Sequence, residues 1–112
     1  MNIVLRLLVS GVAVFISAKL LSKGVYLDSF FTALLVAVVL GVINFTVKPV
    51  IKILTLPLNL ITFGLLSFVI NALMILLVDY FVAGFRVQNF IWALLFSLLL
   101  SVINSFLSRL AK

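Results

Sequence analysis

Four long apolar stretches constrain the fold of this chain more than any other feature of its sequence. They run from about residue 3 to 21, 29 to 47, 59 to 82 and 90 to 107, and a helix needs roughly 20 residues to span a bilayer. Of the 112 residues, 67% are hydrophobic and 9% are charged, whereas a soluble domain has about 25% charged residues. A chain this short has no room to bury so much apolar surface in its own core. The sequence therefore predicts an all-α membrane protein with four transmembrane helices.

The residue types that carry most catalytic and metal chemistry are missing. The chain has no cysteine and no histidine. It therefore has no disulfide, no thiolate nucleophile and no Cys/His metal site, and it lacks histidine, the commonest general base. It also lacks paired carboxylates, a nucleophile–base set and a glycine-rich phosphate loop. We therefore expect no enzyme, no cofactor, no metal and no known small-molecule ligand. Because neither Asp28 nor Asp79 lies in the middle of a stretch, a proton-coupled transporter is disfavoured as well.

The eight basic residues lie at the ends of the stretches and give a net charge of +6. They form no basic run or aromatic-and-basic patch, so we expect no nucleic-acid partner. Lipid is the expected partner instead, including anionic headgroups. The first stretch lacks a convincing small-x-small cleavage site, which favours a retained helix over a signal peptide.

The distribution of basic residues also predicts the topology. Four spans put both chain ends on one side of the membrane. That side would carry five basic residues, and the opposite side would carry three: Lys19, Lys23 and Arg86. The excess predicts cytoplasmic termini in a multi-pass inner-membrane protein. The five residues are Arg6, Lys48, Lys52, Arg109 and Lys112.

An internal repeat relates the two halves of the chain. "ALLVAVVLGVIN" at 33–44 aligns without gaps with "ALLFSLLLSVIN" at 93–104, an offset of 60, and seven of the twelve positions are identical. We interpret the chain as two tandem helical hairpins, residues 1–47 and 59–112, joined by a connector at 48–58. Each hairpin has an even number of spans, so the two copies point the same way and are expected to be related by an axis along the membrane normal.

Small residues recur every four positions in the second and fourth stretches, and in each case the series leads to an asparagine. This spacing puts them on one helix face, where small side chains let backbones approach closely. A helix-packing seam is the favoured interpretation, and a face lining a water path is the alternative. The residues are Ala33, Ala37 and Gly41 before Asn44, and Ala93, Ser97 and Ser101 before Asn104.

Three further polar residues stand out within or beside the spans. Asn71 lies in the middle of the third stretch, where its amide needs a partner and is expected to hydrogen-bond to another helix; a pore or selectivity role is the alternative. Asp79 occupies the repeat position of Lys19. This exchange of sign suggests an ion pair between the hairpins, although such pairs near a surface contribute little.

The connector contains both prolines of the chain, Pro49 and Pro57. Pro49 suits a first helical turn, whereas Pro57 denies a hydrogen bond to a preceding carbonyl and favours a break. We predict a short interfacial helix over about 49–56, with its polar stripe at the cytoplasmic headgroups. A broken helix lining a pore is the alternative. The stripe consists of Lys48, Lys52, Thr55, Asn59 and Thr62.

Residues 42–77, "VINFTVKPVIKILTLPLNLITFGLLSFVINALMILL", resemble a family motif. The motif joins an Asn before a basic-Pro pair to "ILTLPLN", "TFGL" and "FVINAL". It is similar to phage holin superfamily IV, the YvlD-like bacterial four-span proteins, and the likeness extends over nearly the whole chain. The candidates for functional importance within it are Asn44, Lys48, Pro49, Lys52, Thr55, Pro57, Asn59, Gly64 and Asn71.

The resemblance implies a holin-like protein of the bacterial inner membrane, a class that oligomerises and opens lesions releasing an endolysin. It assigns no catalytic residue. Because kinship does not settle function, two alternatives stay open. One is a non-lytic envelope protein with a structural, assembly or stress-linked role. The weaker one is a small ion channel or transporter.

Overall fold

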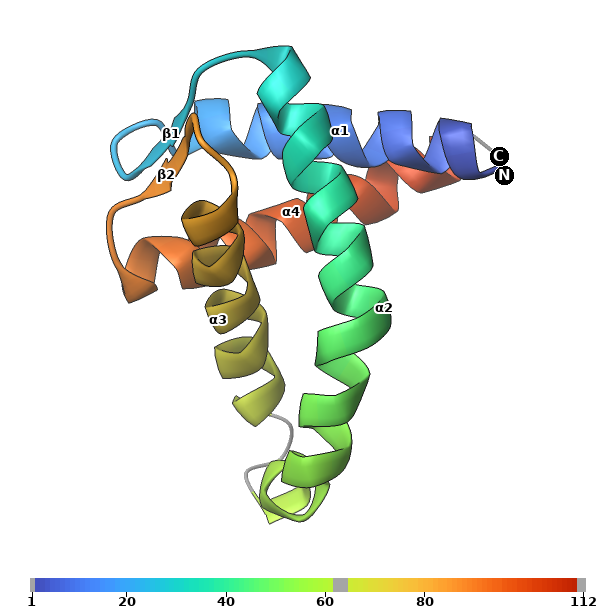
Figure 1. Cartoon of the computed structure of the whole chain (residues 1–112), viewed down its shortest axis with the longest axis vertical. Helices are drawn as coiled ribbons and strands as arrows, with labels where there is room; N and C mark the ends of the chain where they lie inside the picture. The colour runs from blue at the N-terminus through green and yellow to red at the C-terminus, as the bar shows by residue number, and fades with distance from the viewer. Residues whose placement is uncertain (1, 62–64, 111–112) are drawn as a thin grey trace.

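Four helices and a two-stranded ribbon make up the described part of the chain (Figure 1). The computed structural model describes residues 2–61 and 65–110, without the side chains of residues 55 and 58–61. The elements follow the order α1 (Ile3–Leu20), β1 (Val25–Leu27), α2 (Phe30–Ile61), α3 (Leu65–Phe81), β2 (Phe85–Val87) and α4 (Phe90–Leu110). The four predicted helices are therefore present, and the ribbon is an element that the sequence did not lead us to expect.

Three of the helices are long and apolar enough to cross a membrane, judged on the described residues. They are α1, the Phe30–Leu54 part of α2, and α4. The fourth, α3, is apolar but has 17 residues, a length of about 26 Å. The predicted third span of 59–82 is therefore too long at its start, because residues 59–61 belong to the end of α2.

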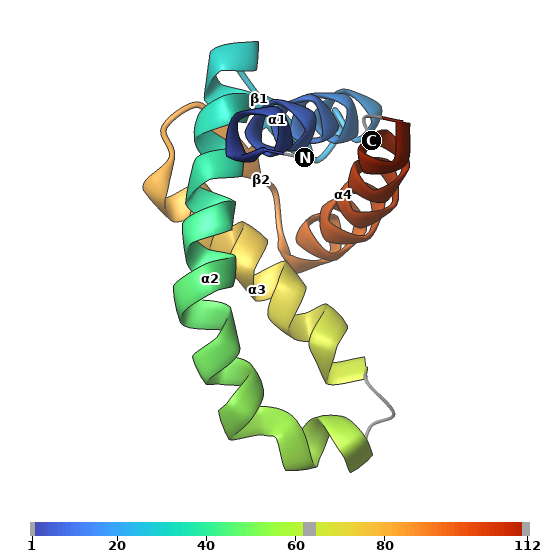
Figure 2. The ribbon, with the colours of Figure 1, turned by 90° about the vertical axis from the view of Figure 1, so that its right-hand side faces the viewer.

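The two prolines lie inside α2, which runs through the predicted connector without a separate helix. A proline leaves one carbonyl of the preceding turn without its N–H partner, but a long membrane helix tolerates that loss. In Figure 2 the last part of the α2 ribbon turns sideways toward α3. An independent segment at 48–58 is thus corrected to the end of one long helix, while its placement at the membrane surface stays a prediction.

The ribbon forms where the two short links of the sequence meet. β1 and β2 are antiparallel, with Tyr26 opposite Arg86 at the centre of the ladder. The ladder is extended by two bonds, from Asp28 N to Gly84 O at 3.0 Å and from Gln88 N to Gly24 O at 2.8 Å. Both strands alternate buried, exposed, buried, which is the period of a half-buried strand.

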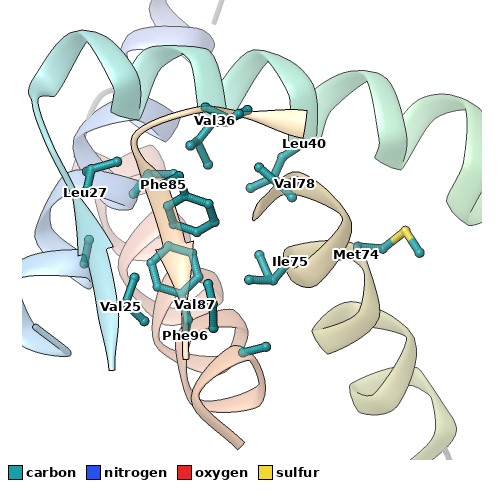
Figure 3. Close-up of a cluster of buried hydrophobic side chains, with 14 of the residues drawn as sticks. Val25, Leu27, Val36, Leu40, Met74, Ile75, Val78, Phe85, Val87 and Phe96 are labelled. Atoms are coloured by element: carbon teal, nitrogen blue, oxygen red, sulfur yellow. The ribbon is translucent and has the colours of Figure 1, made fainter. Parts of the chain in front are cut away.

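The core lies beneath the buried face of this ribbon (Figure 3). Phe85 and Phe96 are fully buried, with ring centroids 5.5 Å apart. Around them pack buried aliphatic side chains from the strands and from α2 and α3: Val25, Leu27, Val36, Ile75, Val78 and Val87. One face of each link is therefore part of the core.

From the ribbon the helices diverge as two pairs (Figures 1 and 2). We call α1 with α4 the terminal arm, because it contains the first and the last helix of the chain. We call α2 with α3 the connector arm. α1 and α3 each contact both α2 and α4, but within the described ranges α1 does not contact α3, nor does α2 contact α4. The helices thus do not form a parallel bundle.

Gly24 lies next to the first strand and against the ring of Trp92, the only tryptophan of the chain. A Cβ atom at position 24 would overlap the Trp92 ring, whereas a Cβ atom at Gly41 would meet nothing within 4 Å. Gly84 is constrained differently, since its φ of +90° lies in the left-handed region that favours glycine.

We predict that Gly24→Ala lowers the unfolding free energy by about 1–3 kcal/mol, the usual cost of overpacking. Thermal unfolding in detergent measures the loss, and the emission of Trp92 reports the displaced ring. Gly41→Ala is the matched control and is expected to be neutral or slightly stabilising. Equal stability of the two variants would contradict the described packing of Trp92.

Candidate functional site

One cavity lies in the angle between the two arms. It has a volume of about 330 Å³ and is bordered by α1, α2 and α4, with Arg6, Ser10, Gly41 and Asn44 on its walls. A larger groove of about 640 Å³ runs between α1 and α2 and shares Arg6, Ser10 and Gly41 with it. We treat the two as one space and call it the arm cleft.

Arg6 gives the arm cleft its charge. It lies in the first turns of α1, and among the described residues no carboxylate pairs with it. Both acidic side chains of the chain are elsewhere: Asp79 pairs with Arg86, and Asp28 lies against Gly84 beside the ribbon. The arm cleft is therefore electropositive, with no internal counter-ion from a side chain.

Ser10 and the two asparagines add polar groups at or near the same place. Ser10 Oγ donates to Asn104 Oδ1 at 3.4 Å, which joins α1 to α4 within the terminal arm. Asn44 is exposed and lines the arm cleft from α2. Asn71 lies half-buried on α3, where no described residue hydrogen-bonds its amide. The interhelical bond expected of Asn71 is therefore not found among the described residues, and the bond that joins α1 to α4 involves Asn104.

The two small-residue stripes are buried only near the ribbon. Ala33, Ala37, Ala93 and Ser97 are buried there, as close helix packing requires. One turn further on, Gly41 and Ser101 are exposed. The divergence of the arms explains this change. The predicted seam is therefore closed at one end, and at the other end α2 opens into the arm cleft.

Asp79 forms an ion pair, but with Arg86 rather than with Lys19. The Asp79 Oδ1–Arg86 Nη1 distance is 3.1 Å, and Asp79 Oδ2 accepts a hydrogen bond from Val87 N at 3.0 Å. Lys19 instead lies 5.3 Å from the centroid of the Phe15 ring. The proposed Lys19–Asp79 pair is corrected accordingly: the return of β2 after α3 brings Arg86 to the carboxylate first.

The candidates in the former connector lie at the far end of α2. Lys48 is half-buried there, while Pro49, Lys52 and Pro57 are exposed. The side chains of Thr55 and Asn59, as well as Thr62 and Gly64, lie outside the described residues. The structure therefore does not bring these candidates to the arm cleft.

Sequence reasoning used Arg6 only to assign topology and did not consider Ser10. The signal was available, because the two residues are four apart on an otherwise apolar helix and share one face. The sequence does not show that α1 diverges from α2. This divergence makes the face that carries Arg6 and Ser10 a wall of the arm cleft.

Comparison with known proteins gives one family and two relatives. Residues 1–106 match the family of mycobacterial 4 TMS phage holins, superfamily IV. The uncharacterized protein SCO3922 of Streptomyces coelicolor is 36% identical over 99 residues, covering 84% of this chain and 79% of that protein. The uncharacterized membrane protein YvlD of Bacillus subtilis is 29% identical over 86 residues, covering 76% and 72%. No solved structure matches the chain.

We predict that Asp79→Ala destabilises the protein by about 1–3 kcal/mol, because the buried Val87 N–H loses its acceptor. Arg86→Ala should cost no more than about 1 kcal/mol, since its side chain is 62% exposed. Unfolding in detergent measures both. In a double-mutant cycle, Asp79 should couple to Arg86, and Lys19→Ala with Asp79→Ala should be additive. Coupling to Lys19 instead would refute the described pairing.

Proposed function

Because this chain belongs to the mycobacterial four-transmembrane-segment phage holins of superfamily IV, we propose that it oligomerises in the bacterial inner membrane and permeabilises it. In this proposal the protein has no enzymatic activity. Oligomerisation and permeabilisation depend on helix faces that contact another copy of the chain or water.

The observation that carries this proposal is a polar stripe on the outside of α4. Ser101, Ser105 and Arg109 are all exposed, and they follow one another at four-residue spacing, hence on one face. They border a shallow hollow together with Val102 and Phe106. No described residue accepts or donates a hydrogen bond at either serine. In a lone protomer this stripe would face lipid, whereas in an oligomer it can face a second copy or water.

We further propose that residues 1–47 and 59–112 are two copies of one hairpin related by a pseudo-two-fold axis. Three spacings support this. The strands begin 60 residues apart (85 − 25), α2 and α4 begin 60 apart (90 − 30), and the central ribbon pair, Tyr26 and Arg86, is also 60 apart. A shift of 60 also exchanges the two bonds that flank the ladder. Each arm then contains one helix from each copy.

This symmetry favours one orientation in the membrane. The dyad of an antiparallel ladder is perpendicular to the ribbon, and the axis of a parallel repeat runs along the membrane normal. In the proposed arrangement the ribbon therefore lies flat on the outer surface, and both arms open toward the cytoplasm. The termini and the end of α2 are then cytoplasmic, in agreement with the excess of basic residues there.

The test is the leak of a trapped dye from vesicles that hold the purified protein, together with its oligomeric state in detergent. We predict leakage from an oligomer. Ser101→Leu with Ser105→Leu should weaken association by about tenfold, since each interhelical serine bond contributes about 0.6 kcal/mol. Ile91→Val with Leu95→Val is the control, since both residues are exposed on α4 outside this hollow, and it should leak normally.

In cells, induced expression should collapse the membrane potential. A cell that keeps its potential while the protein is abundant would contradict the permeabilising role and favour the non-lytic envelope protein. A purified protein that stays monomeric and tight would contradict the oligomer as well.

A further inference from the structure

The arm cleft contains a cation, Arg6, that no carboxylate of the described residues neutralises. Arg6 lies between α1 and α2 in a membrane-embedded chain, and no described residue forms an ion pair with it. Arg6 is exposed in the first turns of α1, where a basic side chain at the end of a span can meet anionic headgroups. Arg6 is therefore available to an anion from outside the chain.

The walls of the arm cleft define what kind of anion fits. Arg6 and Asn44 present N–H donors near Ser10, and a guanidinium matches a phosphate with two parallel hydrogen bonds. The same groove continues along apolar side chains of both helices, namely Leu7, Val38, Val42 and Phe45. Its volume of about 640 Å³ is within the range of small-molecule sites. A charged headgroup attached to an acyl chain satisfies both parts.

We propose that the arm cleft binds one anionic phospholipid, with its phosphate on Arg6 and Asn44 and an acyl chain along Leu7, Val38 and Phe45. Charge complementarity favours this occupant over a second copy of the chain. A second copy has only two acidic side chains, one held by Arg86 and the other beside the ribbon. Free phosphate would satisfy the arginine but leave the apolar groove uncovered.

The second half of the chain shows that hairpin packing does not require this charge. Under the proposed 60-residue repeat, Arg6 corresponds to Leu66 and Ser10 to Ile70, both part of the apolar packing of α3. The charged cleft thus belongs to one hairpin alone. Arg6→Leu places in the first half the side chain that the second half already carries, so we expect it to fold. Lipid binding at this site does not depend on permeabilisation.

The test uses the full chain with Phe45→Trp, because Phe45 is 84% exposed at the groove and tolerates a larger ring. It is placed in vesicles of equal phosphatidylglycerol and phosphatidylcholine, with bromine on the chains of one lipid or the other. Bromine quenches only nearby indole rings, and the protein with Phe45 intact gives the background from Trp92. We expect phosphatidylglycerol to outnumber phosphatidylcholine about fivefold next to residue 45. This is the ratio that about 1 kcal/mol from one arginine gives at an anionic surface.

Two variants should abolish the enrichment by different routes. Arg6→Leu removes the charge, and Gly41→Leu fills the open space of the arm cleft while Arg6 stays in place. Lys52→Leu is the control, since it removes one exposed basic residue from the far end of α2, outside the arm cleft, and should retain the enrichment. Circular dichroism and Trp92 emission show that each variant is folded.

The outcomes separate the alternatives. Equal quenching by both lipids in the parent protein would overturn the proposal, as would an equal loss in Arg6→Leu and Lys52→Leu, which indicates only a general surface charge. Loss of the enrichment in millimolar inorganic phosphate would assign the site to free phosphate instead of lipid. Dye leakage measured on the same vesicles reports the permeabilising role separately.

Discussion

The antiparallel ladder between β1 and β2 holds the ends of all four helices at one point. Each strand has three residues, so neither satisfies its backbone groups alone, and pairing with the other strand supplies the missing partners. Paired with each other and extended by two flanking bonds, they form a short ribbon whose apolar face covers Phe96. Asp79 fixes α3 to this unit through Val87, and Gly24 brings Trp92 of α4 against it.

The arm cleft follows from the same constraint. Helices that are joined at one end and differ in direction must separate at the other, so the small-residue stripes are buried at Ala33 and Ala93 but open at Gly41 and Ser101. This opening is what exposes Arg6 on one side and the α4 stripe on the other. The proposed lipid site and the proposed oligomer face are thus two consequences of one divergence, with different residues and different tests.

Several features of the protein could be predicted from its sequence, because they depend on apolar length and on a long motif. The four helices were predicted and are present, and the resemblance to holin superfamily IV and to YvlD is confirmed. The ribbon was missed because three residues are too few for alternation to be recognised. α2 continues through Pro49 because proline weakens a membrane helix without ending it. The repeat predicted that Asp79 pairs with Lys19, but Arg86, seven residues after Asp79, forms the ion pair instead.

The central proposal is that the ribbon caps the outer surface and both arms open toward the cytoplasm. Because the chain has no cysteine, a thiol can be introduced at one position at a time. Tyr26 is 57% exposed on the ribbon, and Ile3 is 82% exposed at the start of α1. A membrane-impermeant thiol reagent should label Tyr26→Cys in right-side-out vesicles and Ile3→Cys in inverted vesicles, and not the reverse. Labelling of both positions from the same side would contradict the account.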